Sequence, residues 1–172
     1  MESPIERIEN QPTLFEHLLN IIVLPFTVTV IVPFLVYPDQ VSYIRESTFL
    51  KVIGVVIFFM GLVLFSYTVY LFGRIGRGTL APWSPPKRLV VKGPYLYCRN
   101  PMISGIFFML LGEACVLHSV NIFLWAALVF IINTIYFIFV EEVALQKRFG
   151  EEYARYKSAV PMWIPKTKPY HP

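Results

Sequence analysis

Two polar segments, separated by two apolar runs, hold most of the residues that could carry chemistry. Residues 87–102 combine lysine and arginine with glycine, proline and tyrosine, and residues 141–153 open with two adjacent glutamates. Apolar runs of this length would cross a membrane and return, so both polar segments are expected at one bilayer surface. This arrangement suggests one shared site for a charged cofactor in a membrane enzyme.

The residue types in these segments indicate which ligand would fit. Arg99 stands just before Pro101 at an expected helix start, where free backbone N–H groups attract a carboxylate or phosphate. Tyr95 offers an aromatic face to a base or a cation. Glu141 and Glu142 suit an ammonium, ribose hydroxyls or a sulfonium. S-adenosylmethionine has all of these parts. The alternative is that the charges only mark membrane boundaries.

Glu113 is the candidate for proton transfer. It is expected mid-span, where an ionised side chain is costly and usually faces a cavity or a partner. An amine acceptor must lose a proton before methylation, and a carboxylate could take it. Alternatively, Glu113 pairs with Asn133 or His118 in a structural role. Asn133 shares a helix face with Phe137 and Glu141, and this face could line an acceptor channel or serve ordinary packing.

Composition indicates the scaffold that positions these residues. Of 172 residues, 56% are apolar and 15% are charged, as in membrane proteins. We predict an all-α integral membrane bundle of about four transmembrane helices, forming a single domain with an N-terminal two-helix part at 1–72 and a cofactor-binding core at 73–165. The expected spans are residues 14–37, 49–72, 102–120 and 121–140.

Prolines, glycines and one polar break predict details of this bundle. Pro25 and Pro33 predict a kink in the first helix, whose freed carbonyls neighbouring helices would satisfy. Gly54 and Gly61 would allow close helix packing, or they are filler. The break at residues 118–121 is short, so the last two spans should form an antiparallel hairpin.

The polar connections predict the orientation. Residues 73–101 are rich in glycine and proline but also contain aromatic residues, which favours an ordered irregular loop at the membrane surface. The loop has no acidic residue and six basic ones, namely Arg74, Arg77, Lys87, Arg88, Lys92 and Arg99. By the positive-inside rule the loop, the cofactor site and both termini are cytoplasmic. The last span should continue to Phe149, followed by a helical C-terminal tail at 151–159.

The net charge and the two cysteines indicate which partners the protein is expected to have. The net charge of +4 is modest, and the basic residues stand beside apolar spans, where they set topology or contact membrane lipids rather than nucleic acid. Cys98 and Cys115 lack metal-ligand spacing, so we expect reduced thiols and no metal site. Residues 1–13 lack the pattern of a cleaved signal peptide, so the first span is expected to remain.

Two motif sets together resemble a known superfamily. The first is Leu89-Val90, Gly93, Tyr95, Arg99-Asn100-Pro101 and Gly105. The second is Glu141-Glu142, Leu145, Phe149-Gly150, Tyr153 and Tyr156. With this spacing, residues 73–165 resemble the core of the isoprenylcysteine carboxyl methyltransferase and phospholipid methyltransferase superfamily. Gly76-Arg77-Gly78 is similar to a Gly-x-Gly element of the phospholipid enzymes.

The resemblance implies a site for S-adenosylmethionine at the cytoplasmic end of the bundle. Position by position, it implies cofactor contacts at Lys87, Arg88, Leu89, Val90, Tyr95, Asn100, Pro101, Met102, Ile103 and Glu141, with Glu142 as an adjacent candidate. Beside these, the catalytic candidates are Glu113 and Arg99, and the substrate-facing candidates are Asn133 and Phe137.

Four positions depart from the superfamily pattern. Lys87 and Asn100 stand where histidines are usual, and Asn100 cannot titrate near neutrality. Ile103 replaces a tyrosine. Phe137 replaces the arginine that pairs with the substrate carboxylate in isoprenylcysteine enzymes. This last change disfavours a prenylcysteine carboxylate and favours an apolar amine, a thiol or a lipid head group.

The predicted function is therefore S-adenosylmethionine-dependent methyl transfer to a lipophilic acceptor, which is a lipid amine, a thiol or a prenylcysteine-like carboxylate. Two alternatives remain. Membrane sterol reductases share a similar C-terminal architecture but bind NADPH. A non-catalytic membrane scaffold of the same fold would explain the loss of both histidines and the arginine.

Overall fold

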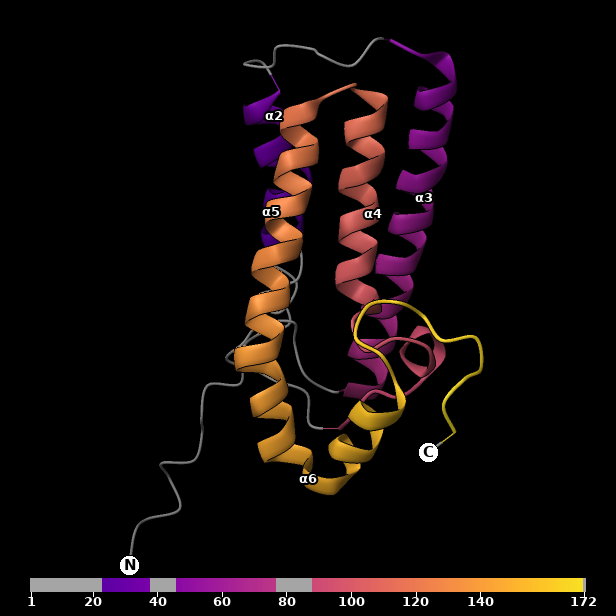
Figure 1. Cartoon of the computed structure of the whole chain (residues 1–172), viewed down its shortest axis with the longest axis vertical. Coiled ribbons are helices and arrows are strands. Elements are labelled where there is room, and N and C mark those ends of the chain that lie inside the picture. Colours follow the sequence, from indigo (N-terminus) through magenta and orange to yellow (C-terminus); the bar gives the residue numbers. More distant parts are fainter. Residues whose placement is uncertain (1–22, 38–45, 77–87, 172) are drawn as a thin grey trace, which may run out of the picture.

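The described residues form a helical bundle with irregular connections. The computed structural model describes residues 23–37, 46–76 and 88–171, and none of these residues forms a strand. The elements are η2 (Thr27–Ile31), α2 (Val32–Val36), α3 (Thr48–Leu71), η3 (Phe72–Gly76), η4 (Gly93–Leu96), α4 (Pro101–Val116), α5 (Val120–Tyr136), η5 (Phe137–Glu141) and α6 (Glu142–Ala159). Figure 1 shows α2 to α5 running side by side along the long axis. The predicted all-α bundle is confirmed.

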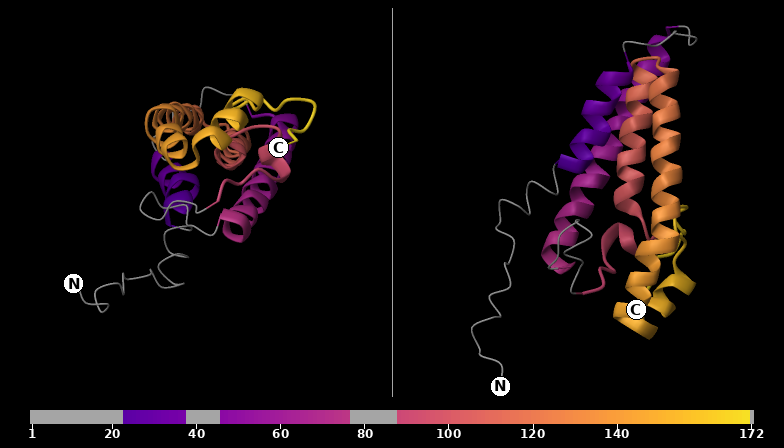
Figure 2. Two further views of the ribbon diagram at one scale, coloured as in Figure 1. Left: turned by 90° about the horizontal axis from the view of Figure 1, so that it is seen from below. Right: turned by 90° about the vertical axis from the view of Figure 1, so that its left-hand side faces the viewer.

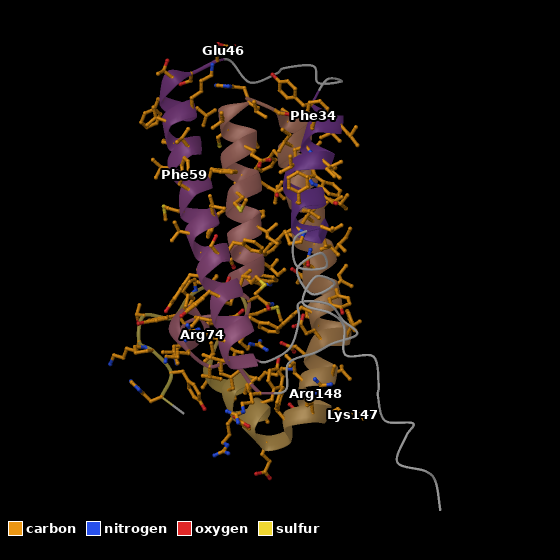
Figure 3. All side chains as sticks on the ribbon, turned by 180° about the vertical axis from the view of Figure 1, so that it is seen from behind. Phe34, Glu46, Phe59, Arg74, Lys147 and Arg148 are labelled. Carbon is orange, nitrogen blue, oxygen red and sulfur yellow. The ribbon has the colours of Figure 1, made fainter. Side chains whose placement is uncertain are left out.

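Two helices are long and apolar enough to cross a membrane, Thr48–Ile75 and Val120–Ala159. The helices Val23–Val36 and Pro101–Val116 are apolar but shorter than the roughly 20 residues of a typical span. Large apolar side chains such as Phe34 and Phe59 point outward (Figure 3), as expected for a surface that faces lipid. Four complete crossings stay a prediction, since residues 14–22 of the first expected span lie outside the described residues.

Helices α3 and α4 pack backbone against backbone at four glycines. A Cβ atom on Gly61 would lie 2.6 Å from the Gly105 carbonyl oxygen, and one on Gly112 would lie 2.6 Å from the Gly54 carbonyl oxygen. In each helix the two glycines are seven residues apart, or about two turns, so they share one face. Of the two alternatives for Gly54 and Gly61, the structure shows close packing, and Gly105 and Gly112 are their partners on α4.

The first helix needs a partner for a backbone carbonyl near its proline. In the π-helical turn the Val32 N–H donates to the Thr27 carbonyl. The next donor in this pattern would be residue 33, but Pro33 has no N–H. The Val28 carbonyl instead accepts a hydrogen bond from the indole Nε1 of Trp125 on α5, at 3.0 Å. A neighbouring helix therefore satisfies this carbonyl, as predicted.

The turn between α4 and α5 produces the predicted antiparallel hairpin. His118 adopts the left-handed backbone conformation with a φ of 51°. Ser119 caps α5, since its Oγ accepts from the Ile122 N–H at 3.3 Å. The His118 Nε2 accepts from the Ser47 N–H at 2.9 Å, which fastens the start of α3 to this turn. The hairpin places the start of α4 and the end of α5 at the opposite end of the bundle.

The last helix continues beyond α5 and is interrupted after Phe149, as predicted. The helix continues through η5 into α6, where Gly150 has a φ of 53° and breaks the helical path. The residues after α6 then bond to the loop before α4, because the Lys166 N–H donates to the Tyr97 carbonyl at 3.1 Å. Figure 2 shows α6 and this C-terminal segment across the end of the bundle where α4 begins.

The glycine contacts give a matched stability test. Gly61→Ala and Gly112→Ala place a methyl group against backbone atoms that cannot move aside, so each should cost about 1–3 kcal/mol of stability. Gly73→Ala adds the same group where no atom lies within 4 Å, so the thermal midpoint in detergent should stay unchanged. Equal midpoints for all three variants would refute the backbone contact.

Candidate functional site

A buried ion pair joins the two polar segments. The Arg99 Nη1 donates to the Glu142 Oε1, and only 9% and 5% of these two side chains are exposed. The Glu142 Oε2 accepts from the Lys157 Nζ at 2.6 Å, and the Arg99 Nη1 also donates to the Tyr153 hydroxyl at 3.5 Å. The segment before α4 and the start of α6 therefore meet, as the sequence predicted.

Backbone hydrogen bonds from the C-terminal segment also hold the turn at Arg99 and Asn100, which we call the Arg99 corner. The Arg99 N–H donates to the Pro161 carbonyl at 2.9 Å, and the Asn100 N–H donates to the Met162 carbonyl at 3.2 Å. The Asn100 carbonyl accepts from both the N–H and the Oγ of Ser104, at 3.1 and 3.0 Å. Sequence reasoning missed the role of residues 161–162, because no local pattern signals this distant pairing.

Three buried nitrogen donors at this end have no hydrogen-bond partner among the described residues: Arg99 Nε, Asn100 Nδ2 and Trp163 Nε1. Asn100 is only 7% exposed. Buried polar groups are nearly always hydrogen-bonded, so such atoms normally meet a water or a ligand. All three are donors, so the complementary ligand atoms are acceptors such as carboxylate, phosphate or carbonyl oxygens.

Glu141 differs from its neighbour because its side chain is exposed. No hydrogen bond or ion pair to a described residue occupies its carboxylate. Burial, and then the charge of Glu141, raise the pKa of Tyr95. Burial and Glu142 raise the pKa of Tyr153 to about 12. Both phenols therefore stay protonated at neutral pH and can donate hydrogen bonds.

The substrate-facing candidates lie on the α5 side of the Arg99 corner. Phe137 is buried, and its ring centroid is 6.0 Å from the Arg99 Cζ. An arginine at position 137 would set a second cation against Arg99, which explains why phenylalanine suits this site. Asn133 uses its Nδ2 within its own helix, donating to the Val129 carbonyl at 2.8 Å.

The remaining cofactor candidates are less closely grouped. Val90 packs with Leu71 and Tyr95, while Leu89 lines a pocket of about 220 Å³ that none of Arg99, Asn100 or Glu142 lines. Arg88 is exposed, Pro101 is buried, Met102 and Ile103 are half-buried, and Ile103 packs against the core of the bundle. Lys87, Arg77 and Gly78 lie outside the described residues.

Glu113 is not brought to this end of the molecule. It lies in the last turn of α4, not at mid-helix, and is twelve residues beyond Pro101, or about 18 Å at a rise of about 1.5 Å per residue. Its Oε2 is buried without a hydrogen-bond partner among the described residues. The expected structural partners are engaged elsewhere, since His118 bonds Ser47 and Asn133 bonds Val129.

The two cysteines form no disulfide. Cys98 and Cys115 are both free thiols, and burial raises the pKa of Cys98. Within residues 23–37, 46–76 and 88–171, no group of three or more His, Cys, Asp or Glu side chains could hold a metal ion.

Comparison with known proteins identifies the class. A model of the phospholipid methyltransferase family matches residues 49–152, which is more than half of the chain. The chain therefore belongs to the phospholipid methyltransferase family and is a membrane methyltransferase. The match covers α3 to the middle of α6 and includes both members of the Arg99–Glu142 pair. Neither the curated proteins nor the solved structures gave a match.

The buried pair can be tested by removing one charge. Glu142→Gln leaves the Arg99 guanidinium buried without its anion, which should cost roughly 3–5 kcal/mol and lower the thermal midpoint strongly. Glu151→Gln removes an exposed carboxylate from the same helix and should leave the midpoint nearly unchanged. Equal losses in the two variants would contradict the buried ion pair.

Proposed function

We propose that this membrane protein uses S-adenosylmethionine to methylate a lipophilic acceptor, at the end of the bundle where Arg99 meets Glu142. The observation that carries the proposal is the set of unpartnered donors beside this pair. Arg99 Nε and Asn100 Nδ2 are buried, lie within the region matched by the family, and lack acceptors among the described residues. A ligand that brings an anionic oxygen would satisfy them.

Each residue of the site would meet a particular part of the methyl donor. Arg99 and Asn100 would hold its carboxylate, with Glu142 keeping the guanidinium in position. The Glu141 carboxylate, which has no partner among the described residues, would take an ammonium group or ribose hydroxyls. Tyr95, kept neutral by burial, would lie beside Glu141 as an aromatic wall. These residues come from the two segments that the ion pair joins.

The chain's contribution to methyl transfer is positioning and the exclusion of water. A bound cofactor would supply an electrophilic methyl group, and the residues of the site would hold a thiolate or carboxylate acceptor in line with it, with the demethylated cofactor as the leaving group. Phe137 and the Arg99–Glu142 pair are buried, so a ligand bound beside them would be shielded from bulk water. We assign no proton transfer to Glu113, because about 18 Å of helix separates it from Pro101.

Charge distribution supports a cytoplasmic location for this end. Arg74, Lys147 and Arg148 lie at the end of the bundle that holds the site, whereas Glu46 lies at the opposite end (Figure 3). Glu46 is paired there with Lys51 at 3.4 Å, so that pair carries no net charge. By the positive-inside rule, we place the site and the C-terminus in the cytoplasm.

Cofactor binding is the first test of the proposed function. S-adenosylhomocysteine should raise the thermal midpoint of the purified protein in detergent, because it binds the folded state, and NADPH should not. Stabilisation by NADPH alone would indicate a reductase. No response to either compound would indicate a scaffold of the same fold.

Two site variants test the assigned contacts. Asn100→Ala and Glu141→Ala should each weaken binding of S-adenosylhomocysteine about tenfold, because each removes one polar contact to the amino-acid part of the ligand or to its ribose. Glu151→Ala should leave the affinity unchanged. Calorimetric titration measures all three.

Methylthioadenosine supplies the matching ligand control, because it lacks both the carboxylate and the ammonium group. Asn100→Ala should bind it as tightly as the unmodified protein does. Weaker binding of both ligands by Asn100→Ala would show that the variant damages the pocket in general, and would overturn the carboxylate assignment.

A further inference from the structure

A tryptophan beyond the family match packs on aromatic side chains of α5 and α4. The Trp163 ring centroid is 4.7 Å from that of Phe130 on α5, and Phe130 is 4.9 Å from Phe107 on α4. Residue 163 follows the region that the family model matches, which ends at residue 152. The C-terminal segment therefore adds an aromatic side chain to a stack formed by residues of the family core.

The position of Trp163 is set by the same backbone that builds the site. Pro161 and Met162, the two residues before it, accept hydrogen bonds from the N–H groups of Arg99 and Asn100, at 2.9 and 3.2 Å. These bonds tie the backbone just before Trp163 to Arg99 and Asn100. Its ring is further held by packing against Phe130.

The indole nitrogen of Trp163 is buried but has no acceptor among the described residues. Trp125 offers a comparison within the same protein, because its Nε1 donates to the Val28 carbonyl at 3.0 Å. A buried indole N–H usually finds a partner. With no acceptor among the described residues, the N–H of Trp163 is available to a ligand oxygen or to a water molecule.

Trp163 and Arg99 contact different levels of the helix that runs from α5 into η5. Arg99 lies over Phe137 and Trp163 packs on Phe130, seven residues earlier in the same continuous helix. Seven residues correspond to about 10 Å along the axis, further into the bundle. Because the two rings that Arg99 and Trp163 contact are offset by this length, the two side chains would contact different parts of the bound molecules.

We propose that Trp163 is a specificity-determining residue that donates its indole N–H to an oxygen atom on the head group of the methyl acceptor. The acceptor class is a lipophilic molecule with a phosphate, ester or similar oxygen close to the methylated atom. The proposal rests on the proposed function for the identity of the reaction. The contact itself can be tested without any turnover.

The experiment compares Trp163→Phe with Trp125→Phe in delipidated protein held in detergent. Each variant keeps an aromatic ring and loses one indole N–H. Phosphatidylethanolamine in mixed micelles is the oxygen-bearing probe, and hexadecylamine, which has no oxygen, is the matched probe. The readouts are the thermal midpoint without ligand, and its rise with each lipid and with S-adenosylhomocysteine.

Trp163→Phe should keep the ligand-free midpoint, because the lost N–H made no hydrogen bond within the described protein. It should respond normally to S-adenosylhomocysteine and hexadecylamine, but bind phosphatidylethanolamine about tenfold more weakly. Trp125→Phe should lower the ligand-free midpoint, since it strands the Val28 carbonyl, and should keep its response to both lipids.

Three results would overturn the inference. An unchanged response of Trp163→Phe to phosphatidylethanolamine would mean that the indole N–H bonds only water. No rise in the thermal midpoint of the unmodified protein with phosphatidylethanolamine would mean that this lipid does not bind, and so is not the partner of the indole N–H. A parallel loss of the response to S-adenosylhomocysteine would assign Trp163 to the cofactor. Failure of the proposed function is separate, because it appears as no response of the unmodified protein to S-adenosylhomocysteine.

Discussion

The buried pair of Arg99 and Glu142 is the interaction on which the rest of the site depends. A guanidinium and a carboxylate are costly to bury apart, and each needs further hydrogen bonds to be satisfied. Glu142 receives a second cation from Lys157, and Arg99 also reaches Tyr153. This network ties the start of α4 to α6, and so brings together two segments that are distant along the chain.

Rigid packing elsewhere makes that pairing possible. The glycine contacts let the backbones of α3 and α4 pack directly against each other. The turn at His118 and Ser119 reverses the chain, so that α5 runs antiparallel to α4. Because α4 and α5 are antiparallel neighbours, the start of α4 and the end of α5 both lie toward the end of the bundle where α6 is found (Figure 1). The C-terminal segment then closes the corner through its bonds to Arg99 and Asn100. The polar site is thus formed by the α4–α5 hairpin together with α6 and the C-terminal segment.

Features encoded locally could be predicted from the sequence, and features set by distant packing could not. Glycine spacing, the short break near His118 and the interruption at Gly150 act within a few residues, and the structure confirms them. The burial of Glu142 and exposure of Glu141 depend on helix rotation, where one residue turns the side chain by about 100°. Trp163 was missed because its backbone neighbours pair with residues far along the chain.

Hydrogen exchange measured by mass spectrometry, with and without S-adenosylhomocysteine, tests the central claim most directly. If one ligand lies against both joined segments, the amides of residues 95–103 and 141–153 should become protected together, while those of residues 48–60 should not change. Protection of only one segment, or protection confined to the end of the bundle near Glu113 and His118, would contradict the account.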